Sequence, residues 1–152
     1  MKLNETDHRA LALWAADCAE RTIGYFDRKI PSDDRPRLAI EVSRAWARGE
    51  ITVGKTRSAS VAAHAAARGA KNDSAKAAAR SAGHAAATAH MFQHARHAAN
   101  YAIKAISESG ENAKNATKAG LELKWQFEHL PVHLRPIVFP EFESPENEED
   151  FD

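Results

Sequence analysis

The chain has 152 residues and a single cysteine, Cys18, so it cannot build an internal disulfide framework or a cysteine-based zinc ribbon. It contains no run of about 18 consecutive apolar residues, so we expect no membrane-spanning helix. Acidic residues interrupt the first stretch, MKLNETDHRALALW, where a secretory signal would carry an unbroken apolar segment. We therefore expect a soluble, cytoplasmic protein.

The signatures of common catalytic sites are also missing. There is no GxSxG nucleophile elbow, no phosphate-binding P-loop, no dinucleotide-binding glycine pattern and no HExxH zinc motif. Cys18 lies in an apolar helical stripe without a CxxC partner, which favours a place in the core over a role as nucleophile. We therefore expect a protein that is not an enzyme and needs no cofactor.

What the chain does have is an uneven charge distribution behind a formal net charge of zero. Residues 1–54 and 108–140 are each balanced, whereas residues 55–107 carry eight basic side chains against one acid, a net charge of +7. Residues 141–152 carry seven carboxylates and no base, a net charge of −7. This composition predicts a single all-helical domain over 1–140, followed by a disordered acidic tail over 141–152.

Apolar residues recur with helical spacing along most of the chain. The pattern predicts helices over about 11–26, 35–48, 58–68, 74–108 and 112–130, with the apolar segment 130–139 lying extended against them. Alanine is concentrated in the middle, where 21 of the 32 alanines lie within 58–105. Because alanine favours helix and lets helix axes approach closely, we expect an all-α fold. It would be a compact bundle or short α-superhelix of five to six helices with an alanine-rich central helix.

Ring side chains repeat along the long predicted helix, where His90, His94, His97 and Tyr101 follow one another at i, i+4, i+7 and i+11. Imidazoles at i and i+4 can share a metal ion, which makes the three histidines candidate metal ligands. No carboxylate lies within 74–107 to complete a ligand set, so histidines that are hydrogen-bonded between helices or exposed to solvent are the simpler interpretation. A pH-sensitive surface is a third alternative.

The basic middle of the chain is the best indication of a partner, because a net charge of +7 attracts nucleic acids or acidic proteins. The acidic tail has the opposite charge: it could bind the basic middle of the same chain, bind a basic partner, or remain in solvent and solvate the protein. The candidate partner-binding residues are Arg68, Lys71, Lys76, Arg80, Glu148, Glu149 and Asp150. The alternative for the basic residues is an ordinary solvated face.

Four segments resemble blocks that are shared by one protein family. They are ALWAADCAER at 12–21; DRPR, AIE and RAW between 34 and 46; TAH, HA and YAIKA between 88 and 105; and LP and LR between 130 and 135. In this order they are similar to the opening helix, the second helix, the long alanine-rich helix and the closing segment of the putative immunity protein family. These are all-α proteins associated with bacterial polymorphic toxin systems, and the resemblance covers about residues 11–139.

The resemblance implies an all-helical protein that binds and neutralises a cognate toxin in the cytoplasm, without catalytic activity of its own. It transfers no toxin contact and no metal ligand to a position of this chain. The function we expect is therefore that of an immunity protein whose partner is a toxin rather than a membrane. The alternatives are a nucleic-acid-associated protein that uses the basic middle, 55–107, and a histidine-based metal-binding protein.

Overall fold

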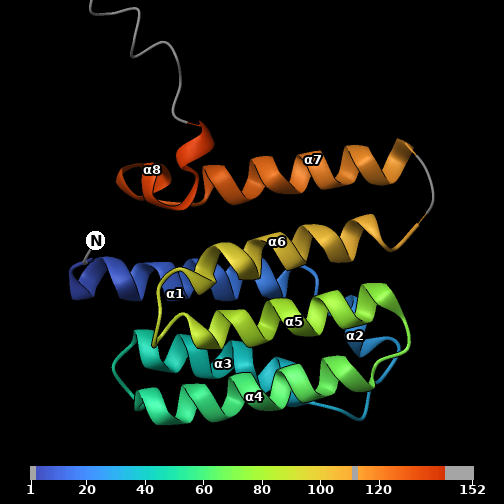
Figure 1. The fold of residues 1–152 in the computed structure, drawn as a ribbon, viewed down its shortest axis with the longest axis horizontal. Coiled ribbons are helices and arrows are strands. Elements are labelled where there is room, and N and C mark those ends of the chain that lie inside the picture. Colours follow the sequence, from blue (N-terminus) through green and yellow to red (C-terminus); the bar gives the residue numbers. More distant parts are fainter. Residues whose placement is uncertain (1–2, 111–112, 143–152) are drawn as a thin grey trace, which may run out of the picture.

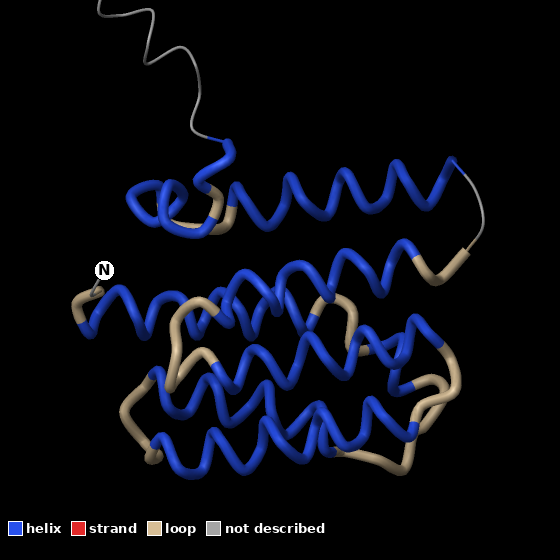
Figure 2. Tube along the Cα trace, viewed as in Figure 1, coloured by secondary structure: helices blue, strands red, loops and turns tan. Residues whose placement is uncertain are grey.

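In a computed structural model, the described residues, 3–110 and 113–142, are almost entirely helical and contain no strand (Figures 1 and 2). The all-α expectation is therefore confirmed for this part of the chain. Its elements are α1 (Glu5–Glu20), α2 (Gly24–Asp27), α3 (Arg35–Ala47), α4 (Val53–Gly69), α5 (Asp73–Ala87), α6 (His94–Ser107), α7 (Ala113–Glu128), the 3-10 turn η1 (Val132–Leu134), α8 (Arg135–Val138) and the 3-10 turn η2 (Pro140–Phe142). Eight α-helices in the described residues exceed the five to six expected, and two of them, α2 and α8, have only four residues. None of the described helices is both long and apolar enough to cross a bilayer.

Helices α4, α5, α6 and α7 follow one another across the molecule and alternate in direction (Figure 1). Helix α1 packs against α5 and α6, and α3 packs against α4 and α5, so these two helices form a second layer. Helix α5 thereby contacts α1, α2, α3, α4 and α6. This arrangement makes α5 the most enclosed of the long helices.

Small side chains allow the helices to approach α5 closely. Eleven of its fifteen residues are buried, and all eleven are alanine, serine or glycine. Buried hydroxyls cross the short gap that remains: Ser74 and Ser81 donate to the carbonyl oxygens of Ala105 and Ala98 in α6, at 2.6 and 2.7 Å. Each hydrogen bond satisfies a buried polar group and ties two helices together.

Larger side chains fill the space between α1, α7 and the C-terminal turns. The indole of Trp14 donates to the carbonyl oxygen of Gln126 at 2.8 Å and meets the ring of Phe139 edge-on, with centroids 5.9 Å apart. Cys18 is fully buried on α1, where burial raises the pKa of its thiol well above the ordinary value. The expected place of Cys18 in the core is confirmed.

Three expectations about the boundaries of elements are wrong. The single helix expected over 74–108 is two helices, α5 and α6, which fold back on each other across a turn at 88–93. The Thr88 hydroxyl donates to the carbonyl oxygen of His84 at 3.0 Å at the end of α5, and the buried alanine faces of α5 and α6 then pack together. The helix expected to begin at Ser58 begins at Val53 instead. The segment 130–139, expected to be extended, forms η1 and α8, because Pro136 occupies the first turn of α8, where a helix needs no N–H group.

Candidate functional site

The central helix α5 reaches the surface along one stripe. Its four residues that are not buried are Asp73, Lys76, Arg80 and His84. They follow one another at i, i+3, i+7 and i+11 and so lie on one face of the helix. Every side chain that the most enclosed helix exposes is therefore ionisable.

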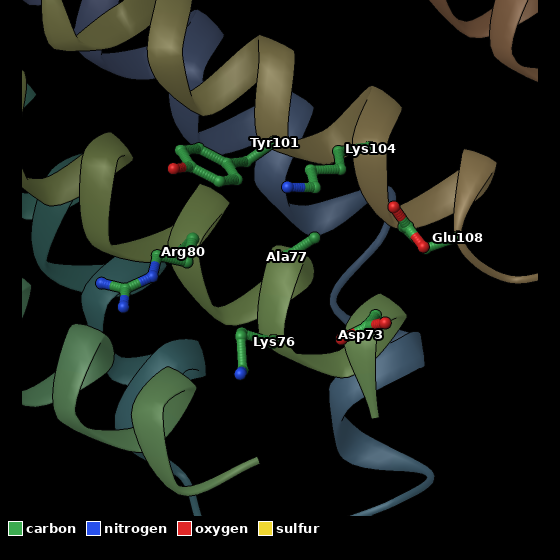
Figure 3. A pocket seen from close by; sticks show the side chains of 7 residues that line it. All are labelled: Asp73, Lys76, Ala77, Arg80, Tyr101, Lys104 and Glu108. Carbon is green, nitrogen blue, oxygen red and sulfur yellow. The ribbon is translucent and has the colours of Figure 1, made fainter. Parts of the chain in front are cut away.

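Three of these side chains, Asp73, Lys76 and Arg80, line a groove. Tyr101 and Lys104 of α6 and Glu108 just after this helix form the other side of the groove (Figure 3). The groove has a volume of about 270 Å³, and a neighbouring hollow of about 290 Å³ on α6 shares Tyr101 and Lys104. The two carboxylates of the lining lie together at one end, and Tyr101 and Arg80 lie at the other (Figure 3). We call the surface formed by Lys76, Arg80, Tyr101 and Lys104 the cationic groove.

Most basic side chains of this region have no acidic partner. Among the described residues, no carboxylate lies within ion-pair distance of seven of the eight basic side chains of 55–107, which are Lys55, Arg57, Arg68, Lys71, Lys76, Arg80 and Lys104. By contrast, six arginines of residues 1–54 each pair with a carboxylate. The uneven charge of the sequence therefore becomes a surface with an excess of positive charge, in which the carboxylates of Asp73 and Glu108 line the groove without forming an ion pair with its bases.

Five histidines gather beside the cationic groove. This histidine cluster consists of His64, His84, His90, His94 and His97. The ring of His84 is central: its centroid lies 4.9 Å from that of His64, 5.1 Å from that of His94 and 5.2 Å from that of His97. It also stacks on Tyr101 at 5.2 Å, so the cluster and the cationic groove share a wall. The Nδ1 atoms of His84 and His94 are 2.9 Å apart, which requires that one donates and the other accepts.

Burial is the main cause that keeps His64 and His84 uncharged. It lowers the pKa of His64 to about 4 and that of His84 to about 3, and nearby positive charge, including that of Arg80, adds to the effect. The pKa values of His90 and His94 are also lowered, again mainly by burial. Arg80 Nη1 donates to His64 Nδ1 at 2.9 Å, a bond that a doubly protonated ring could not accept. At pH 7 His64 and His84 therefore add no positive charge to this face.

The predicted stripe of His90, His94 and His97 is not one helical face. His90 lies in the turn before α6, with its ring centroid 5.3 Å from that of His94. Its Nδ1 atom is buried without a hydrogen-bond partner among the described residues. Within this same part of the chain, no group of three or more His, Cys, Asp and Glu side chains is arranged to hold a metal ion. The metal-binding alternative thus finds no ligand set there.

The structure places two of the predicted partner-binding residues together. Lys76 and Arg80 line the cationic groove, whereas Arg68 and Lys71 are exposed near the turn between α4 and α5 and do not belong to the lining. The three acidic candidates, at 148–150, lie outside the described residues.

Sequence reasoning did not find that His64 and His84 meet beside Tyr101 and Lys104. Part of the signal was visible, because the charged and histidine side chains of the alanine-rich segment recur at 73, 76, 80 and 84 and mark an exposed stripe. The rest was hidden by the expectation of one continuous helix over 74–108. A continuous helix places Lys104 about 42 Å along the axis from Lys76, whereas the turn at 88–93 brings both into one groove.

The first acidic residue of the C-terminal segment contacts the basic region. Glu141 forms an ion pair with Arg96 of α6 at 2.6 Å, and this contact lowers the pKa of the Glu141 carboxyl. The guanidinium of Arg96 also donates to the carbonyl oxygen of Val138 at 2.7 Å and lies over the ring of Phe139, 4.4 Å from its centroid. The start of the acidic segment is therefore held on α6.

Comparison with known families identifies one relationship. Residues 1–133 match the family described as Imm-5 like putative immunity protein, and this range includes the cationic groove and the histidine cluster. No curated protein and no solved structure matches the chain. The match confirms the resemblance seen in the sequence and covers most of its length. The chain therefore belongs to the Imm-5 like putative immunity protein family.

Proposed function

We propose that this protein is an immunity protein that binds a cognate bacterial toxin in the cytoplasm and blocks it without catalytic activity of its own. Membership of the family supports a toxin as partner in general. The proposal needs no metal and no cofactor, because a protein that occupies a surface of its partner acts by binding alone. The surface that we assign to this contact is the cationic groove with the exposed bases around it.

The observation that carries this assignment is the unpaired positive charge of the cationic groove. Lys76 and Lys104 come from two different helices, line the same groove and pair with no carboxylate among the described residues. The three bases of the groove outnumber its two carboxylates, Asp73 and Glu108, so an acidic partner is attracted to the basic side of the groove. Complementary charge also speeds encounter, which suits a protein that must reach a toxin quickly.

The donors of the cationic groove are suited to carboxylates. Arg80 presents a planar fork of N–H groups, Lys76 and Lys104 present compact positive charges, and Tyr101 adds a hydroxyl and an aromatic face (Figure 3). These groups recognise an anionic side chain by charge and hydrogen bonding. We infer that the contacting surface of the toxin is acidic at this point.

Co-expression tests the proposed function. The protein is produced in a bacterial host together with the toxin encoded beside its gene, and growth and co-purification are measured. We expect growth to be restored and the two proteins to purify together. Undiminished toxicity, with no complex recovered at low ionic strength, would contradict the proposal.

The same positive surface makes nucleic-acid binding the second candidate function. Binding through phosphate contacts would weaken steeply as salt is raised. A mobility shift with a short DNA duplex and a short RNA at low ionic strength distinguishes the two candidates. A salt-sensitive shift, together with no effect on the toxin, would favour the nucleic-acid function.

A further inference from the structure

We propose that the acidic C-terminal segment, 143–152, binds the cationic groove of its own chain and occupies it until a partner displaces it. This segment lies outside the described residues and follows directly on Phe142, where the described chain ends. The contact forms in the free protein and therefore does not depend on the identity of the toxin.

The described chain already begins this contact. Glu141 pairs with Arg96 at 2.6 Å, and Arg96 is further held by Val138 and Phe139. Of the eight basic side chains of 55–107, Arg96 is the one that pairs with a carboxylate among the described residues, and its partner, Glu141, lies two residues before the segment 143–152. The chain that leads into this segment thus already binds a base of α6.

The distances are within reach of the remaining chain. Arg96 and Lys104 are eight residues apart on α6, which is about 12 Å along the helix axis. Ten residues beyond Phe142 span up to about 33 Å when extended. The segment is therefore long enough to run from Arg96 along α6 and across the groove to Lys76 and Arg80.

The charge of the segment is opposite to that of Lys76, Arg80 and Lys104, the three bases of the groove, which outnumber its two carboxylates, Asp73 and Glu108. The segment 143–152 carries six carboxylates and no base, while seven bases of 55–107 have no described acidic partner. Tethering raises the effective concentration of these carboxylates at the groove to the millimolar range, so even weak contacts would be populated. An untethered acidic peptide or a nucleic acid would have to compete with this internal ligand.

The contact also explains how a protein with seven bases that lack a described acidic partner would avoid binding unrelated polyanions. With the segment in place the groove is screened, and only a partner that offers better complementary contacts displaces it. The C-terminal segment would thus select among partners of the groove rather than simply solvate the protein.

Paramagnetic relaxation in the full-length chain tests the proposal. A nitroxide is attached at residue 151 in the variant Phe151→Cys, which keeps all six carboxylates, with the buried thiol removed by Cys18→Ala. We expect strong broadening of the backbone amide signals of Lys76, Arg80 and Lys104. The broadening should disappear in about 1 M salt, where the Debye length is about 3 Å. Broadening that is no stronger at these amides than on the outer surface of α3 would overturn the proposal.

Charge variants distinguish the groove from general attraction. Lys76→Glu with Lys104→Glu should abolish the broadening, whereas Arg35→Glu with Arg48→Glu, which changes the net charge equally on exposed positions of α3, should preserve it. Equal loss in both variants would show that the segment follows net charge rather than the groove, and would contradict the proposal.

A binding measurement gives an independent readout. In the full-length chain the six carboxylates of 143–152 are replaced by their amides (Glu→Gln, Asp→Asn), and poly-L-glutamate is titrated as the probe. We expect this variant to bind the probe about tenfold more tightly than the unaltered chain, because the internal competitor is gone. Equal affinities for the two chains would overturn the proposal, whatever the result with a toxin.

Discussion

The ring of His64 lies against the backbone of α5 at Gly83, where a Cβ atom would come within 2.7 Å of Nε2. Ser60 of α4 donates to the carbonyl oxygen of the same glycine at 2.8 Å. Glycine inside a helix ordinarily costs about 1 kcal/mol relative to alanine. Here the missing side chain makes room for a histidine of the cluster and allows α4 and α5 to meet.

We therefore predict that Gly83→Ala lowers the free energy of unfolding by roughly 1 kcal/mol. The methyl group forces His64 to move, at an overpacking cost of about 1–3 kcal/mol, which outweighs the gain in helix propensity of about 1 kcal/mol. Gly120→Ala in α7 is the matched control, because nothing lies within 4 Å of its added Cβ, and it should stabilise the protein by up to about 1 kcal/mol. Urea unfolding measures both. Stabilisation of equal size in the two variants would refute the role of Gly83.

The histidine cluster gives stability a pH dependence of defined sign. The folded protein keeps His64 and His84 neutral, with pKa values of about 4 and about 3, whereas in the unfolded chain they take up protons near pH 6.5. The unfolded state thus binds more protons between pH 6.5 and 4, so stability is complete above this range and falls as the pH is lowered through it. The charged or titratable groups that act on these two rings are Arg68, Arg80, His94 and His97. None of them is acidic, so none offsets the effect.

We expect the midpoint of urea unfolding to fall steadily between pH 7 and pH 5, and His84→Gln to make this fall shallower. His129→Gln is the control, because His129 is exposed after α7 and outside the cluster. If the two variants show the same pH dependence as the unaltered chain, the cluster is not the source of the effect.

At the scale of helices, composition predicts helical structure well but does not predict where a helix stops. The segment 74–108 is rich in alanine, which favours helix, so the helix propensity of its residues does not indicate the turn at 88–93. Tertiary packing determines where the turn forms, because the chain that folds back at 88–93 buries the alanine faces of α5 and α6 against each other. Lys76 and Arg80 could be identified from the sequence as candidate binding residues, since charged side chains in an alanine-rich helix must face solvent. Tyr101 and Lys104, the residues of α6 that line the same groove, could not be identified, because their position beside α5 depends on the turn at 88–93.

Polar contacts add to the apolar packing that attaches helix α7 to the rest of the fold. Arg21 at the end of α1 donates two hydrogen bonds to Glu122, at 2.6 and 2.9 Å, and its guanidinium lies 4.0 Å from the ring centroid of Trp125. The Glu122 side chain is only 9% exposed, so it depends on this partner. Gln126 adds a hydrogen bond to the carbonyl oxygen of Ala99 in α6 at 2.9 Å.

Removing the arginine should loosen α7. We predict that Arg21→Ala costs about 1–2 kcal/mol, less than a fully buried pair because the arginine side chain is 40% exposed, and that it speeds amide hydrogen exchange in α7. Lys124→Ala, which removes an exposed pair on the same helix, should cost less than about 0.5 kcal/mol. Equal effects of the two substitutions would show that Arg21 does not anchor the helix.

At the scale of the whole molecule, the neutral net charge hides a difference between two parts of the chain, residues 1–54 and residues 55–107, in how their basic side chains are paired. Six arginines of residues 1–54 form ion pairs within the fold, whereas seven of the eight bases of 55–107 have no acidic partner among the described residues. Three of these seven, Lys76, Arg80 and Lys104, line a groove between α5 and α6 in a member of an immunity protein family. We propose that this surface is kept for an acidic partner, and that the acidic C-terminal segment occupies it beforehand.

The most direct test is the affinity for the toxin encoded beside the gene, measured by isothermal titration calorimetry on three full-length proteins: the unaltered chain, Lys76→Glu/Lys104→Glu and Arg35→Glu/Arg48→Glu. We predict that the unaltered chain and the α3 variant bind alike, while the groove variant binds about 100-fold more weakly. If the unaltered chain does not bind, the immunity function is wrong. If all three bind equally, the immunity function stands and the cationic groove is not its binding surface.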